Sequence, residues 1–391
     1  MLMRARLASF LALVSVALGA SARADGPVDP QAPATFDKVV TQLRRLVACD
    51  TRVPDSQVKP PDGITLKQID GSCKKVKSQV ERFRKRWLDK ARPFIAELVP
   101  KDISKTIVYP FGGADLMTAL TVYPDLELLT TMSLEWVGDP RAILTLDAGA
   151  LRKNLAQQHA FLIKLFQVNH NRTVDLQELN QSPIPAPLVF GLKALDLLGY
   201  EPVSARWFQL GPNGEVKYLT PNDIKAFDAA GKKQKDRNEF FANMELSFRK
   251  SGVANAPIQV WRHMRVNLHD DNFKKSPTLA YLEHLGPISG ITKAASYLMW
   301  REDFGVIRNF MLDHMRWMIS DTTGPAPFQA AEKGFVQDTW GTFRGNMFPG
   351  PKKAELAMIE LWKTNPQQVL PFTFGYPDVN DQNHMMVTRK R

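Results

Sequence analysis

Cysteine is scarce in this chain: Cys49 and Cys73 are the only two among 391 residues. Two thiols are too few for a zinc site built from cysteine, and their spacing is not the C-x-x-C of a redox pair. We therefore predict no metal site. In an oxidising compartment two such thiols pair, so we predict a Cys49–Cys73 disulfide.

Several catalytic motifs are also absent. The sequence contains neither G-x-S-x-G nor H-E-x-x-H, so a serine esterase and a zinc protease both lack support. The G-x-G-x-x-G motif of dinucleotide-binding proteins is incomplete, because only the pair Gly112-Gly113 stands in its place. We predict no cofactor.

Beyond the first 24 residues, no apolar run reaches the roughly 18 residues that a membrane span needs. Within those 24 residues, Arg4 and Arg6 precede an apolar stretch at 7–20, and 22–24 is a small-residue cleavage site. We predict a signal peptide over 1–24, cleaved after Ala24, and a periplasmic or secreted mature protein.

Acids are outnumbered: 51 lysines and arginines stand against 40 aspartates and glutamates, a formal net charge of +11. Loss of the leader lowers the charge to +8, because the leader carries three arginines and no acid. Export argues against nucleic acid as the partner, whereas the excess charge permits peripheral contact with an anionic surface. A basic amphipathic helix predicted over 74–98, opened by Cys73, is the candidate docking face; a solvated face is the favoured interpretation.

The stretch from 103 to 138 predicts a strand, a glycine turn, a helix and a second strand. Thr106 to Tyr109 is β-branched and aromatic, Asp115 stands at a helix N-cap, and 126–134 is again strand-like. Such a unit places two parallel strands side by side with a right-handed crossover, and ligands bind beyond their carboxyl ends. Glu135 ends the second strand, where an acid can accept a bond from a ribose hydroxyl.

A second unit of the same kind is predicted between 290 and 325. Residues 291–299 and 317–320 are strand-like, 304–315 is helical, and a polar turn follows at 320–325. Asp321 and Thr322 in that turn are predicted to share the sheet edge with Gly112 and Glu135.

Period-two alternation at 240–248 and 258–268 predicts an antiparallel pair of strands. Glu245, Arg249, His263 and Arg265 would share the opposite face, either as an anion site or, the favoured interpretation, as a solvated charge face. The predicted fold class is α/β, three-layered, with a mixed, mainly parallel, Rossmann-like sheet. A disulfide-stapled helical segment over 25–100 precedes an α/β domain with insertions over 101–391.

Two segments together resemble an uncharacterised family of exported bacterial α/β proteins. They are the YPFGGAD sequence at 109–115, followed by 123–124 and 134–138, and the KAASYLM sequence at 293–299, followed by the SDTTGP sequence at 320–325. The resemblance spans roughly 103–348 and implies a shared fold and site, but it transfers no catalytic residue. The first segment is also similar in shape to the first half of a methyltransferase-type Rossmann sheet.

We therefore expect a binding protein for an unknown small molecule or envelope polymer. One alternative is a hydrolase with Asp115 or Glu135 as base and Ser296 or Lys293 nearby; the other is a structural envelope protein that docks through the basic helix. The candidate ligand-binding residues are Tyr109, Gly112, Gly113, Asp115, Glu135, Lys293, Ser296, Asp321 and Thr322.

Overall fold

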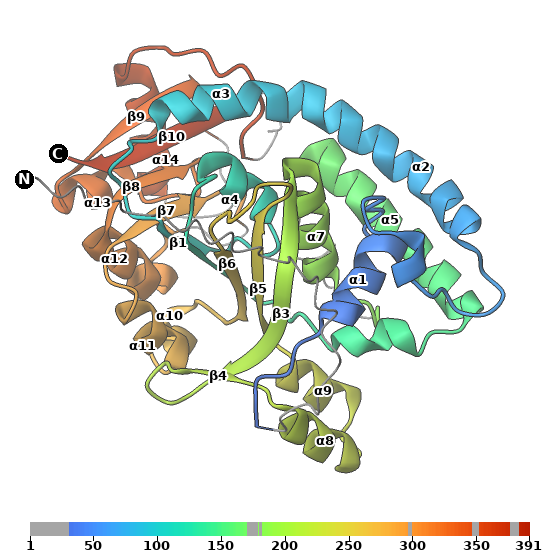
Figure 1. Ribbon diagram of the computed structural model, residues 1–391. Coiled ribbons are helices and arrows are strands. Elements are labelled where there is room, and N and C mark those ends of the chain that lie inside the picture. Colours follow the sequence, from blue (N-terminus) through green and yellow to red (C-terminus); the bar gives the residue numbers. More distant parts are fainter. Residues whose placement is uncertain (1–30, 170–178, 180–181, 296–298, 346–351, 376–382) are drawn as a thin grey trace, which may run out of the picture.

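The computed structural model describes residues 31–391 apart from 170–178, 180–181, 296–298, 346–351 and 376–382. Its centre is a ten-stranded sheet in the order β4-β3-β5-β6-β2-β1-β7-β8-β10-β9 (Figure 1). The strands are β1 (Thr106–Pro110), β2 (Leu128–Ser133), β3 (Tyr200–Leu210), β4 (Val216–Tyr218), β5 (Asn243–Lys250), β6 (Gln259–Arg265), β7 (Ile288–Thr292), β8 (Met315–Ser320), β9 (Phe335–Thr342) and β10 (Asn383–Lys390). The predicted α/β class and mixed sheet are confirmed.

Parallel pairing is confined to the middle of the sheet, where β6, β2, β1, β7 and β8 run in one direction. The flanking strands β4, β3 and β5 on one side, and β10 and β9 on the other, pair antiparallel. The prediction of a mainly parallel sheet is therefore wrong for the sheet as a whole, because the strands on both sides of the parallel core pair antiparallel. Both predicted crossovers are present, with α4 (Leu116–Val122) between β1 and β2 and α12 (Gly305–His314) between β7 and β8.

Local signals explain where several elements begin and end. Asp115 caps α4 by accepting from the Thr118 backbone N–H, as predicted. The basic helix begins well before Cys73, because Thr65 and Gln68 form a capping box at the start of α2 (Leu66–Phe83). A π-helical turn, η2 (Arg84–Leu88), then leads into α3 (Asp89–Leu98).

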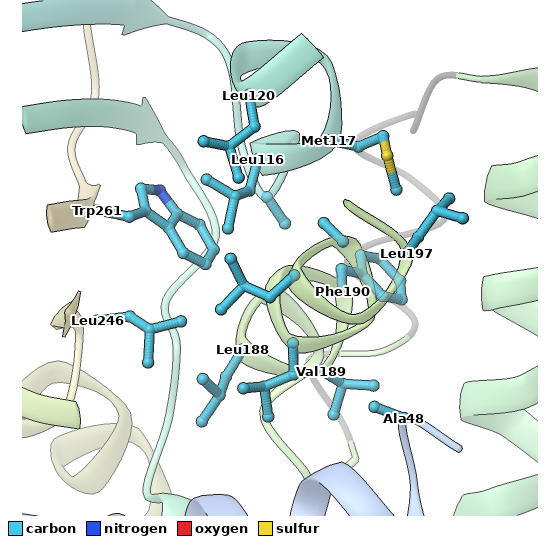
Figure 2. Close-up of a cluster of buried hydrophobic side chains, with 14 of the residues drawn as sticks. Ala48, Leu116, Met117, Leu120, Leu188, Val189, Phe190, Leu197, Leu246 and Trp261 are labelled. Atoms are coloured by element: carbon cyan, nitrogen blue, oxygen red, sulfur yellow. The ribbon is translucent and has the colours of Figure 1, made fainter. Parts of the chain in front are cut away.

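The N-terminal helices pack into the same apolar core as the sheet. One buried cluster joins α1, α2, α3, α4, α5 and α7 to one face of the sheet, and a second cluster lies against α10, α11 and α12 on the other. Figure 2 shows Leu188 of α7 toward Leu246 of β5, Leu116 of α4 beside Trp261 of β6, and Phe190 on the other side of α7. The remaining bounds are α1 (Asp37–Leu46), η1 (Asp55–Gln57), η3 (Pro140–Leu144), α5 (Ala148–Val168), α7 (Ala186–Leu198), α8 (Pro221–Ala229), α9 (Gln234–Phe240), α10 (Asp270–Phe273), α11 (Pro277–Glu283), η4 (Glu302–Phe304), α13 (Pro327–Glu332) and α14 (Lys352–Thr364).

The Cys49–Cys73 disulfide is confirmed, with a Cα–Cα distance of 5.7 Å. It joins the segment after α1 to the middle of α2, beside His159 of α5. Over the residues that the structure describes, no helix is long and apolar enough to cross a membrane. The predicted signal peptide lies outside those residues.

Candidate functional site

The carboxyl ends of β1, β2, β7 and β8 lie along one edge of the sheet, because these strands run parallel. We call this edge the rim and define it as residues 111–115, 134–135, 293–294 and 321–323. The rim brings together the two predicted units, which are about 180 residues apart in the chain. Ser296, which was also predicted for the site, lies outside the described residues.

The turn after β1 needs its two glycines for different reasons. Gly113 has φ +51°, in the left-handed region that glycine adopts without steric cost. Gly112 lies under the ring of Tyr109, where an added Cβ would come within 2.4 Å of the ring carbon Cγ. Phe111 at φ +61° and Ala294 at φ +51° bring left-handed backbone to the rim without glycine, and such conformations cluster at ligand sites. The left-handed Ala294 also turns the chain after Thr292, which is why β7 is shorter than the predicted 291–299 strand.

Lys293 forms the centre of a buried polar cluster that joins β1, α4 and β7. Its Nζ donates to Thr118 Oγ1 at 2.7 Å and lies 3.2 Å from Asp115 Oδ2, with only 1% of the side chain exposed. The Tyr109 hydroxyl donates to the same Asp115 oxygen at 3.0 Å. Burial, and then Asp115, raises the pKa of Tyr109 well above its usual value. Because Asp115 Oδ1 accepts from the Thr118 N–H at 3.1 Å, both carboxylate oxygens are occupied within the protein.

Asp321 and Thr322 hold neighbouring segments in place. Asp321 accepts from the backbone N–H groups of Ala294 at 2.8 Å and Thr323 at 2.9 Å. Thr322 Oγ1 lies 3.0 Å from Nε2 of His384, on β10. Asp321 therefore ties the end of β8 to the end of β7 through the backbone, and among the described contacts it does not bond the Lys293 ammonium.

Glu135 differs from the other rim acids because no hydrogen bond or ion pair within the described parts of the chain engages its carboxylate. The residue as a whole is 4% exposed, and its carboxylate oxygens are not among the described side-chain atoms that are fully buried without a partner, so they keep contact with solvent. Only its backbone is engaged: the N–H donates to Ser133 Oγ at 3.3 Å, and the carbonyl lies 3.0 Å from His263 Nε2. A carboxylate that no protein group engages is free to accept hydrogen bonds from a ligand, so Glu135 is the strongest indication of a ligand at the rim.

His263 connects Glu135 to the glycine turn, and its role was missed from the sequence. Its Nδ1 lies 3.1 Å from the Gly113 carbonyl and 3.1 Å from Thr131 Oγ1. Thr131 Oγ1 also accepts from Trp261 Nε1 at 2.9 Å. The Gly113 and Glu135 carbonyls can only accept, so each ring nitrogen of His263 faces an acceptor, and Thr131 Oγ1 is the neighbour that can donate to or accept from Nδ1.

The predicted charge face of the β5–β6 pair is wrong. Glu245 lies opposite Arg262 and Met244 lies opposite His263, so Glu245 and His263 face opposite sides of the sheet. Glu245 forms ion pairs with Arg206 and Arg262 instead. The error came from assuming one solvated face, whereas helices and loops cover both faces here.

Burial sets the protonation of two histidines, and this gives a testable pH dependence. It lowers the pKa of His263 and that of His159 below the usual value near 6.5. Below about pH 6.5 the unfolded chain therefore binds more protons than the folded chain, so the free energy of unfolding falls with pH. We expect urea unfolding to show this loss between about pH 7 and pH 5, above the range in which carboxylates titrate. The variants His263→Gln and His159→Gln should each flatten the slope, and an unchanged slope in the double variant would contradict the assignment.

A cleft of about 600 Å³ opens beside the chain that follows Glu135. Its walls include Trp136, Asp139 and Arg141, together with side chains of α8 and α9. Arg141 bonds both Asp139 and Asp228, and Arg237 of α9 bonds the same two acids. The cleft therefore has a rigid, charge-balanced wall and a volume within the range of about 300–1,000 Å³ that is typical of ligand sites.

Two further arrangements bear on chemistry. Cys49, Cys73 and His159 place sulfur and nitrogen atoms within 4.8 Å of one another, but both sulfurs belong to the disulfide and so are not thiolate ligands. Of the four rim residues Asp115, Glu135, Lys293 and Asp321, the described contacts join only Asp115 to Lys293.

Comparisons with family models, with curated proteins and with solved structures find no match to this chain.

Proposed function

We propose that this chain is an exported binding protein whose ligand reaches the rim of a Rossmann-like sheet and presents hydroxyl groups to Glu135. The proposal is carried by Glu135, a residue 4% exposed whose carboxylate bonds to no described group of the protein. A carboxylate accepts hydrogen bonds, so O–H groups of a nucleoside, a sugar or an envelope glycan would satisfy it. Its position after the second parallel strand, beside a glycine turn, is the position at which such folds bond a ribose hydroxyl.

Asp115 and Lys293 support a positioning role more than a catalytic one. Each satisfies the other, and Tyr109 and Thr118 complete their hydrogen bonds. A hydrolase would need one of these groups to face its substrate with a free lone pair or proton. The hydrolase alternative therefore has less support than binding, and Glu135 is the rim acid left for a base.

A thermal-shift screen with nucleosides, monosaccharides and cell-wall glycans tests the proposal. We expect the ligand class to raise the melting temperature of the wild type and to leave Glu135→Gln unshifted. The unliganded Glu135→Gln variant should be about as stable as wild type, because no described protein contact of the carboxylate is lost. A loss of binding without a loss of stability is the signature of a residue that contacts the ligand.

Glu127→Gln is the matched control. Glu127 precedes β2 at the opposite edge of the sheet, and its side chain is 74% exposed in a loose pair with Lys105. This variant should behave as wild type in both measurements. Equal shifts of the wild type and both variants by the same compounds would place the ligand elsewhere.

The docking alternative is supported by one observation, the exposed charge of α2, η2 and α3. The exposed cations on this run are Lys67, Lys74, Lys75, Lys77, Arg82, Arg84, Lys85, Arg86, Lys90 and Arg92. The exposed acids on it are Glu81, Asp89 and Glu97. Such an excess of one sign attracts anions over a range of about one Debye length.

A further inference from the structure

A second cleft, of about 440 Å³, lies at the edge of the sheet opposite the rim. It is formed where α3 ends, where the chain enters β1, and where α4 runs into β2. Its residues are therefore distinct from those of the rim and of the Trp136 cleft. Its volume also falls within the range of about 300–1,000 Å³ that is typical of small-molecule sites.

The accessible lining of this cleft is largely apolar. It comes from Ala96 and Val99 at the end of α3, with Pro100, Ile103 and Pro124, while Ile107, Val122 and Leu126 lie behind it and are each at most 1% exposed. Tyr123 also lines the cleft, but its hydroxyl donates to the Gly290 carbonyl at 2.6 Å. These half-buried and exposed apolar walls offer hydrocarbon surface, which favours a hydrocarbon ligand by about 25 cal/mol per Å² removed from water.

The mouth of the cleft is cationic. Arg92 and Lys101 line it, and within the described parts of the chain neither makes a hydrogen bond or an ion pair. The other two charges there are already engaged, since Lys105 lies 3.9 Å from Glu127 and Asp125 lies 4.0 Å from Lys250. Arg92 also belongs to the basic run of α2, η2 and α3, which crosses the outside of the molecule in Figure 1 and raises the local concentration of anions.

We propose that this cleft binds one amphiphilic carboxylate of the fatty-acid type. The alkyl chain lies against the walls formed by Ala96, Val99 and Ile103, and the carboxylate lies at the mouth between Arg92 and Lys101. Charge complementarity selects the head, because a guanidinium and an ammonium without partners match a carboxylate. The apolar lining selects the tail. A short carboxylate would therefore lack the contacts with the apolar lining, and a neutral amphiphile would lack those with Arg92 and Lys101.

Calorimetric titration of the full mature chain tests this with dodecanoate, kept below its aggregation concentration. We expect one dodecanoate per chain, no detectable binding of acetate, and much weaker binding of dodecyl maltoside, which has the same tail and a neutral head. The variant Arg92→Ala/Lys101→Ala should bind at least about tenfold more weakly, a loss of about 1.4 kcal/mol. Ala96→Trp, which fills the cleft from an exposed helix position, should abolish binding while thermal unfolding shows a folded chain.

The control is Arg84→Ala/Lys85→Ala, which removes two exposed cations from the same basic run away from the cleft. It should bind dodecanoate as wild type does. If it weakens binding as much as Arg92→Ala/Lys101→Ala, the interaction is diffuse attraction to the basic surface and the site is refuted. Equal binding of dodecanoate and dodecyl maltoside would refute the carboxylate assignment. Neither result depends on Glu135 or on the rim.

Discussion

Replacing Lys293 with methionine is expected to lower the free energy of unfolding by about 3–5 kcal/mol. The ammonium is 1% exposed and lies 3.2 Å from an Asp115 carboxylate that is itself only 16% exposed. Methionine fills similar space but leaves that carboxylate without its counter-ion and removes the donor to Thr118 Oγ1. The ammonium also lies 5.8 Å from the centre of the Trp87 ring, so a cation–π contact is lost. Urea unfolding at neutral pH measures the change.

A second substitution shows where that loss comes from. Asp115→Asn keeps the cap on α4 through its side-chain oxygen and removes the charge. If the orphaned carboxylate dominates, Lys293→Met/Asp115→Asn should be more stable than Lys293→Met alone. Lys85→Met serves as the exposed control, because Lys85 is 74% exposed and 3.9 Å from Glu81, and should change stability by less than about 1 kcal/mol. A double variant no more stable than the single one would show that lost packing and hydrogen bonds are the cause.

The parts of the fold that local patterns encode were predicted well. The β5–β6 pair follows from period-two alternation, and the two crossover units follow from strand, turn and helix signals that lie within about 35 residues of one another. The strands β9 and β10 were not predicted. Strand β10 is inserted between β8 and β9, so each of its pairings depends on segments far away in the chain. Alternation alone does not reveal such an insertion, and the parallel character of the sheet was overestimated for the same reason.

The shared position of the candidate residues at one sheet edge was predicted, but their contacts were not. Strand ends place Asp115, Glu135, Lys293 and Asp321 on one edge by topology, which a sequence pattern can supply. Which of these groups remains unsatisfied depends on contacts across the fold. His263 meets the Gly113 carbonyl over a separation of 150 residues, and Lys293 meets Thr118 over 175. From the sequence, Asp115 and Glu135 were equally good candidates for a ligand contact. The structure pairs Asp115 with Lys293 and leaves Glu135 as the candidate ligand contact.

Loss of the Cys49–Cys73 disulfide is expected to cost roughly 3 kcal/mol of stability in the chain-entropy description of cross-links. The bridge closes a loop with a sequence separation of 24 and fixes α2 against α1. The effect should reach the rim, because α2 leads through η2 to Trp87. The Trp87 ring lies near Lys293, and its Nε1 donates to the Thr373 carbonyl at 2.7 Å. Thermal and urea unfolding of Cys49→Ala/Cys73→Ala measure the loss.

The reduced wild type separates the cross-link from the packing of the two sulfurs. Cys49 and Cys73 are 2% and 0% exposed, so the alanine variant also loses buried volume, whereas the reduced wild type keeps both sulfur atoms. We expect the reduced wild type to account for most of the loss, and the alanine variant to show no response to reductant. If the reduced protein were as stable as the oxidised one, the constraint on the unfolded chain would contribute little. The bridge would then act through the packing of α1 and α2 around His159.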